Sequence, residues 1–260
     1  MSSYNVCTRM WLNSCRSLIA AAIVIAAAHA GATPMRTVKE PAVIATERST
    51  YAIVQEGGEV GKEASIRRTY DNNTIRFEVS HELHQPGLDM VTKADFLLEE
   101  ESYFPRSYRA AQTVTQPDDE FVHTVGVEMF ANVAVLTSEM RNSKTSRRIV
   151  VPAGIAVQTV GTVYQWHQIL FWVDPKGPGR HKFQWLDPAS GVVESGEIYV
   201  ADPETIVVLG KKTPVTVYKA ERERLGPAII YVDKKKRIVK VEQNMMTYRL
   251  DQWSEELAKK

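Results

Sequence analysis

Apolar and polar side chains alternate strictly along the chain between residues 74 and 83. One face carries Ile75, Phe77, Val79, His81 and Leu83, and the other carries polar and charged side chains. Because successive side chains of a strand point to opposite faces of a sheet, this period of two predicts a β-strand with one buried face. The pattern therefore favours a fold in which a sheet covers a core on one side.

Similar runs recur along the rest of the chain, separated by short turns rich in glycine, proline, asparagine and aspartate. Strands joined in succession by short turns are typical of an antiparallel meander. A polar turn is predicted over 141–146, and the lysines of 234–236 are predicted to occupy a hairpin turn. The predicted strands lie at 51–54, 64–70, 75–83, 88–96, 108–115, 121–130, 131–140, 149–151, 180–186, 191–201, 205–209, 215–221, 228–232 and 237–243.

The period of two is interrupted between residues 161 and 172, where Val163, Trp166 and Leu170 fall at helical spacing. This spacing predicts one short helix. A second short helix is predicted over 253–258, at the end of the chain. We therefore predict a mainly β protein with one large curled antiparallel sheet, an open or half barrel, and one short helix packed on its concave face.

Residues 1–30 have the three parts of a cleavable signal peptide. Arg9 and Arg16 supply the positive charge, and 18–28 is an unbroken apolar stretch, too short to span a bilayer. Ala28-His29-Ala30 then matches the small-x-small pattern of a cleavage site. The alternative is an uncleaved N-terminal anchor. We predict a signal peptide over 1–30, an extended lead-in over 31–49, and a single β-rich domain over 50–260.

Composition limits what the exported domain can do. Cys7 and Cys15 are the only cysteines and both lie in the predicted signal, so the remaining chain can form no disulfide. Its charge is nearly balanced, with 30 basic and 31 acidic side chains after removal of the signal arginines. A nucleic-acid partner demands a clustered basic face, so we expect none. We expect no membrane span after signal cleavage, and the predicted location is the periplasm, or otherwise the medium.

Several segments together carry a resemblance to a known group of proteins. They are the hairpin formed by Tyr51-Ala52-Ile53-Val54 and Gly58-Glu59-Val60-Gly61, the central short helix, and the ending 231–241. The chain resembles exported bacterial β-sheet proteins of unknown function, and through them the open-barrel lipoprotein carriers and outer-membrane lipoprotein receptors of the LolA/LolB-like fold. That resemblance implies a curled sheet that wraps a helix and holds acyl chains. It assigns no functional residue to a position of this chain.

Two histidines are weak candidates for metal binding. In His81-Glu82-Leu83-His84 the histidines are three apart, whereas the zinc-protease helix needs them four apart on one face. On a strand, this spacing points them to opposite faces. His123 lies on the apolar face of another predicted strand and could approach His81 if the two strands are neighbours. The interpretation that we favour is a buried, hydrogen-bonded histidine, with no metal and no cofactor.

Other reactive groups have simpler interpretations. The acidic groups at 99–101 and 118–120 lack the alternating ligands of a calcium loop, and we interpret them as solvated strand ends. Ser190-Gly191 and Ser195-Gly196 lack the flanking glycines of a nucleophile elbow. The basic run 234–237 could touch phosphate head groups, although a charged turn is usually only solvated. No catalytic residue is therefore assigned.

An aromatic group in and after the predicted helix is the candidate ligand-binding site. In one interpretation these side chains fill the concave face as core; in the other, the helix is a lid over a cavity for an apolar ligand. The candidate residues are Tyr164, Trp166, His167, Phe171, Trp172 and Trp185, with Gln168 and Phe183 beside them.

Three functions follow as hypotheses. The first is a non-enzymatic binding or carrier module for a lipid or lipoprotein acyl chain. The second is a scaffold or accessory subunit that offers a sheet edge to a cell-envelope protein. The third is an enzyme acting on envelope polysaccharide or lipid, which would need two convergent carboxylates or a histidine-activated nucleophile.

Overall fold

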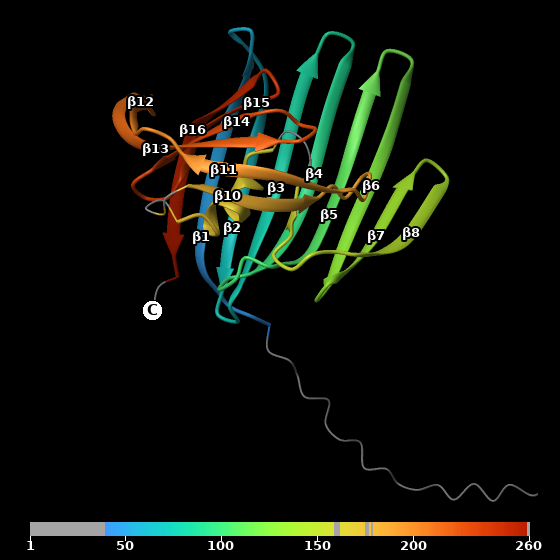
Figure 1. Ribbon diagram of the computed structural model, residues 1–260. Coiled ribbons are helices and arrows are strands. Elements are labelled where there is room, and N and C mark those ends of the chain that lie inside the picture. Colours follow the sequence, from blue (N-terminus) through green and yellow to red (C-terminus); the bar gives the residue numbers. More distant parts are fainter. Residues whose placement is uncertain (1–39, 159–161, 175–176, 178, 259–260) are drawn as a thin grey trace, which may run out of the picture. The chain divides into compact units, whose positions relative to one another are not determined.

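A computed structural model describes residues 40–258, apart from 159–161, 175–176 and 178. The predicted signal peptide, the first part of the lead-in and Gly161 lie outside the described residues. Within the described part of the chain, one large antiparallel sheet accompanies a single short helix, as predicted (Figure 1). No helix among these residues is long and apolar enough to cross a membrane.

The strands follow one another as a meander. The first eight are β1 (Val43–Gln55), β2 (Gly58–Tyr70), β3 (Thr74–Gln85), β4 (Leu88–Glu99), β5 (Pro105–Gln116), β6 (Asp119–Phe130), β7 (Val133–Met140) and β8 (Ser143–Val150). The chain then forms β9 (Ala156–Val157) and the helix α1 (Trp166–Phe171). The remaining strands are β10 (Arg180–Leu186), β11 (Val193–Val200), β12 (Glu204–Val208), β13 (Lys211–Arg222), β14 (Ala228–Asp233), β15 (Ile238–Gln243) and β16 (Met246–Leu257).

The two halves of the meander meet through the first and last strands. The order across the sheet is β8-β7-β6-β5-β4-β3-β2-β1-β16-β15-β14-β13-β11-β10-β9, with β12 paired to β13 off this path. All pairs are antiparallel except β9 with β10. Irregular register occurs at Thr50/Tyr51 and Ile53/Val54 of β1, and such bulges bend a strand and increase its twist. The sheet curls far enough for the terminal strand β9 to contact β5.

The first hairpin illustrates how the sequence fixes this geometry. A two-residue loop joins β1 to β2, and both Glu56 (φ 51°) and Gly57 (φ 84°) have left-handed backbone conformations. Two successive positive φ angles define a type I′ turn, whose twist matches that of the flanking strands. The glycine predicted to turn the chain here therefore does so.

The first strand begins within the expected extended lead-in, because 43–49 is the first half of β1. Two other predictions were wrong. Strand β8 occupies most of the expected turn at 141–146. The expected helix over 253–258 is instead the end of β16, where Ser49 pairs with Trp253 and Ala45 with Leu257. Pairing with a long neighbouring strand overrides the local preference of this segment.

The interior is filled by two clusters of buried apolar side chains that meet at α1. One cluster gathers around β1 and β10–β16 and includes Trp166 and Ile169. The other gathers around β3–β7 and includes Tyr164. We call residues 162–173, which contain α1, the plug segment, because its side chains join both clusters on the concave face.

Candidate functional site

A buried carboxyl group on β2 anchors the start of the plug segment. Glu63 is fully buried, and its two oxygens accept hydrogen bonds from the backbone N–H of Val163, each at 3.0 Å. The N–H of Tyr164 donates to the same carboxyl group at 3.2 Å. N–H groups at the start of a helical segment have no partner within the helix, and here a side chain of the sheet satisfies them.

The middle of the plug segment is fixed by two further buried side chains. Trp166 is fully buried, and its indole Nε1 donates to Oε1 of Gln243 on β15 at 3.2 Å. Gln168 accepts from the backbone N–H of Val157 at 3.2 Å and donates to the carbonyl of Tyr103 at 2.8 Å. The plug segment is thereby bonded to both halves of the sheet.

Three of the six predicted ligand-binding residues belong to the core. Tyr164, Trp166 and Trp185 are each at most 2 % exposed. The ring of Trp166 lies edge-on to Phe183, with centroids 6.4 Å apart, and Phe183 lies 5.4 Å from Trp185. These side chains pack the concave face, as in the first of the two interpretations of the aromatic group.

The other three line a cleft of about 610 Å³ on one side of α1, which we call the α1 cleft. Phe171 stacks on Tyr103 with ring centroids 4.0 Å apart and is still 48 % exposed. Trp172 is half-buried and donates from Nε1 to the carbonyl of Ser102 at 2.8 Å. His167 stacks on Phe77 at 5.6 Å, and burial, with a smaller effect of Arg67, lowers its pKa well below 6.5. The other apolar and aromatic lining residues are Leu170, Val173, Tyr218 and Val232.

Charged groups form the rest of the lining. Arg67, Lys235, Lys236 and Arg237 are basic, and Glu47 and Asp174 are acidic. The α1 cleft therefore combines an aromatic wall with an excess of positive charge.

A small cavity of about 10 Å³ adjoins the α1 cleft. Glu47, Arg67, His167 and Arg237 line both spaces. Two buried donors, Nε of Arg67 and the indole Nε1 of Trp253, have no hydrogen-bond acceptor among the described residues. Both residues line this cavity.

The interior also contains a row of polar side chains across β1, β2 and β3. Tyr51 is paired with Glu63 in register, and Glu63 with His81. Burial raises the pKa of Glu63 to about 8, against the opposing effect of its backbone hydrogen bonds. Burial lowers the pKa of His81 to about 4. Both groups are therefore uncharged at mildly acidic pH.

The structure does not bring the two candidate metal-binding histidines onto neighbouring strands. His81 is on β3 and His123 on β6, with β4 and β5 between them, which separates them by roughly 14 Å at normal strand spacing. His123 instead contacts the Ser138 hydroxyl at 2.9 Å, and His84 contacts Asp89 at 2.9 Å. No group of three or more histidine, cysteine, aspartate or glutamate side chains among the described residues is arranged to hold a metal.

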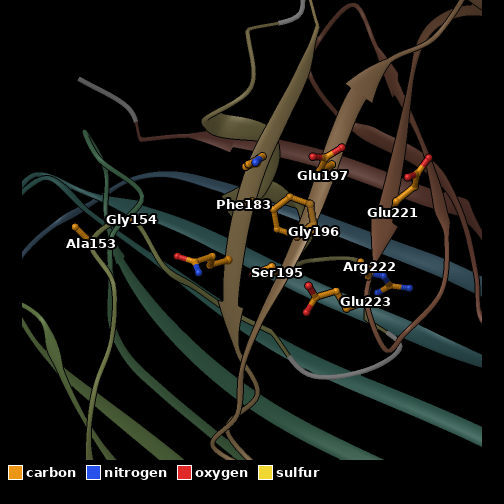
Figure 2. Close-up of a pocket in the computed structure, with 11 residues that line it drawn as sticks. Ala153, Gly154, Phe183, Ser195, Gly196, Glu197, Glu221, Arg222 and Glu223 are labelled. Carbon is orange, nitrogen blue, oxygen red and sulfur yellow. The ribbon is translucent and has the colours of Figure 1, made fainter.

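The serine candidates take part in local structure. The Ser190 hydroxyl donates to Asp187 within the turn between β10 and β11. Ser195 lies beside a second cavity, of about 680 Å³, over β10, β11 and β13 (Figure 2). Gly196 is required there, because a Cβ atom would lie 2.7 Å from Phe183 and 2.8 Å from the carbonyl of Glu221. Figure 2 shows glutamates and Arg222 around this cavity, and its lining includes no histidine from the described part of the chain.

Sequence reasoning missed Glu63 and Arg67, which shape the site from β2. Arg67 lies in a predicted strand and Glu63 directly before it. In the sequence, a charged residue that will be buried in a strand looks the same as one that will face solvent. Glu63 lies on the same face of β2 as the buried Gly61 and is paired with the buried Tyr51 of β1. That pairing depends on the register of the hairpin, which the sequence does not specify.

The fold and the site define an unclosed, half-barrel β domain with a helical plug and a cleft beside it. No family model and no curated protein matches the sequence. Among solved structures, the chain is similar to the crystal structure of a β-barrel-like protein of a domain of unknown function, DUF1849, from Brucella abortus. The TM-score is 0.59 at 8 % sequence identity, over 83 % of this chain and 99 % of the other. This similarity supports the barrel-like fold.

Proposed function

We propose that the protein is an exported, non-enzymatic binding or carrier module that holds an acyl or lipid-like ligand in the α1 cleft. The observation that carries the proposal is the aromatic wall of this cleft, where Phe171 stays about half exposed beside Trp172. A volume of about 610 Å³ lies within the usual range for ligand pockets. Burial of an acyl chain would contribute about 0.8 kcal/mol per CH₂ group.

The plug segment supplies a rigid wall for this cleft. Trp166 and Glu63 fix its first half to the sheet, whereas Phe171 and Trp172 at its end contact the β4–β5 turn. In this proposal the helix is not a lid over the whole concave face. The ligand binds beside the plug segment, and the core stays filled.

Native mass spectrometry of the protein, expressed from its full sequence and released gently from the cell envelope, tests the proposal. We expect a stoichiometric acyl or lipid species and uptake of a fluorescent fatty acid. A protein that carries no such species and takes up no fluorescent fatty acid would contradict the proposal.

A specific observation favours one second candidate, a scaffold for an envelope protein. Strand β8 is the end of the sheet path, and seven of its eight residues are exposed. An edge strand can accept a strand from a partner through main-chain hydrogen bonds. Hydrogen exchange of the β8 backbone amides, measured with and without envelope extract, separates this function from the first. A bound partner strand would slow the exchange of these amides, whereas a ligand in the α1 cleft would not.

A further inference from the structure

We infer that the ligand of the α1 cleft is an amphiphile whose anionic group is bound by the basic residues of the cleft. This inference rests on the proposed function and specifies the ligand class. It is based on the placement of charges and donors around the cleft, which a purely apolar ligand would not use.

The positive charge of the cleft is only partly neutralised by the protein. Arg67 pairs with Glu47 at 2.7 Å, and Nε of Arg237 donates to Asp233 at 2.7 Å. Lys235 and Lys236 form no ion pair with any residue in the described part of the chain. Asp174 is the remaining acid of the lining, and it lies near Tyr218, whose pKa is raised first by burial and then by this carboxylate.

The turn that carries these lysines is held in a fixed conformation. One oxygen of the buried Asp233 accepts from the backbone N–H of Lys235 at 2.8 Å and from that of Arg237 at 3.1 Å. Above it, the Trp253 ring lies 5.2 Å from Nζ of Lys235 and 4.4 Å from the guanidinium of Arg237. Cations that are already positioned lose less conformational entropy when they bind an anion.

Two buried donors lie close to the basic part of the cleft. Nε of Arg67 and Nε1 of Trp253 have no acceptor among the described residues, and both residues line the cavity of about 10 Å³ beside the cleft. Neither atom is open to solvent, so the anionic group of the ligand is assigned to the unpaired ammonium groups of Lys235 and Lys236. A carboxylate or phosphate oxygen accepts hydrogen bonds from such groups.

The two walls of the cleft therefore require different parts of one ligand. Phe171 and Trp172 contribute apolar surface from the end of the plug segment, and the cations come from β2 and from the β14–β15 turn. A carboxylate or phosphate joined to an acyl chain satisfies both walls. A neutral acyl chain contacts only the aromatic residues of the cleft, and inorganic phosphate binds only the cations.

Matched fluorescent probes test this inference: 12-(9-anthroyloxy)stearic acid and its methyl ester, titrated into the purified protein. We expect the acid to bind about tenfold more tightly than the ester. Equal affinities would overturn the inference and leave the proposed function intact, whereas no binding of either probe would overturn both. Displacement of the acid by inorganic phosphate at equal potency to an anionic lipid would also overturn it, because the cleft would then be a simple anion site.

Competition with two lysolipids identifies the source of the anionic group. Displacement by lysophosphatidic acid, but not by lysophosphatidylcholine, would support the inference with a phosphate head group. If neither lysolipid displaces the probe and the acid still binds more tightly than the ester, the inference is supported with a carboxylate as the anionic group. Equal displacement by both lysolipids would contradict it.

Paired variants locate the effect in the cleft. In Lys235→Gln/Lys236→Gln we expect about tenfold weaker binding of the acid and unchanged binding of the ester. Lys211→Gln/Lys212→Gln, on the exposed start of β13, is the matched control and should change neither. Equal weakening in both double variants would show a general charge effect and overturn the assignment.

Discussion

The side-chain carboxyl group of Glu63 on β2 accepts a hydrogen bond from the backbone N–H of Val163, 100 residues later in the chain, at 3.0 Å from both of its oxygens. This contact ties the start of the plug segment to the centre of the sheet. It places a titratable group, with no solvent exposure, at the point where the two parts of the fold meet. The stability of the fold should therefore depend on pH.

The first prediction is a maximum of stability near pH 6.5. The pKa of Glu63 is raised from 4.5 to about 8, so the folded protein binds this proton more tightly than the unfolded chain, and stability falls as pH rises between these values. The pKa of His81 is lowered from 6.5 to about 4, so there the unfolded chain binds the proton more tightly, and stability rises with pH between about 4 and 6.5.

Below pH 6.5 the slopes of Glu63 and His81 largely cancel, and the lowered pKa of the mostly buried His167 leaves a net rise of stability with pH. Above pH 6.5 only the effect of Glu63 remains. Urea unfolding should show a loss of about 2 kcal/mol between pH 6.5 and 8. Glu63→Gln keeps an acceptor for the N–H of Val163 but does not titrate. In this variant the free energy of unfolding should no longer fall between pH 6.5 and 8. If it still falls, another group causes the loss of stability.

The strand pattern was predictable because much of the sheet has one buried face. In β3 the alternation of Ile75, Phe77 and Val79 is visible without any knowledge of the partner strands. In β8 almost every side chain is exposed, so no alternation marks it, and the sequence indicates a turn instead. Its strand conformation depends on pairing with β7, from Val133 with Val150 to Met140 with Ser143.

The candidate site was predictable in part for a related reason. The aromatic residues of the plug segment could be found by composition, but composition could not separate the buried Trp166 from the half-buried Trp172, six residues later. The cleft also needs Arg67 from β2 and Arg237 from the β14–β15 turn, 170 positions apart in the numbering. Their proximity follows from the pairing of β1 with β16, which no local pattern specifies.

The two tryptophans should differ sharply when they are replaced. Trp166→Ala removes a fully buried ring and a hydrogen bond to Gln243, and we expect a loss of roughly 3–5 kcal/mol in the free energy of unfolding. Trp172→Ala removes a half-buried ring and one hydrogen bond, and we expect a loss of about 1–2 kcal/mol with greatly weakened uptake of the fatty-acid probe. Thermal unfolding and probe titration measure both effects; similar destabilisation by the two variants would place Trp172 in the core.

The turn between β1 and β2 should be sensitive at one glycine and tolerant at the next. A Cβ atom on Gly57 would meet nothing within 4 Å, so only its φ of 84° opposes a side chain. Gly57→Ala should cost about 1 kcal/mol through backbone strain alone. Gly58→Ala is the matched control, because its nearest neighbour would be at an ordinary 3.8 Å and its φ is not positive. Equal costs in chemical denaturation would show that the turn type does not determine stability here.

The exposed edge at β8 should be kept from self-association by its charges. Lys144 and Arg148 are exposed on this strand, and charged side chains on an edge strand disfavour pairing with another sheet. The Lys144→Thr/Arg148→Thr variant replaces them with a residue that favours strands, so we expect concentration-dependent association by analytical ultracentrifugation. Lys93→Thr/Arg249→Thr makes the same change on β4 and β16, which have neighbours on both sides, and should stay as dispersed as the unaltered protein. Association of both variants to the same extent would show that lost surface charge, and not the open edge, is responsible.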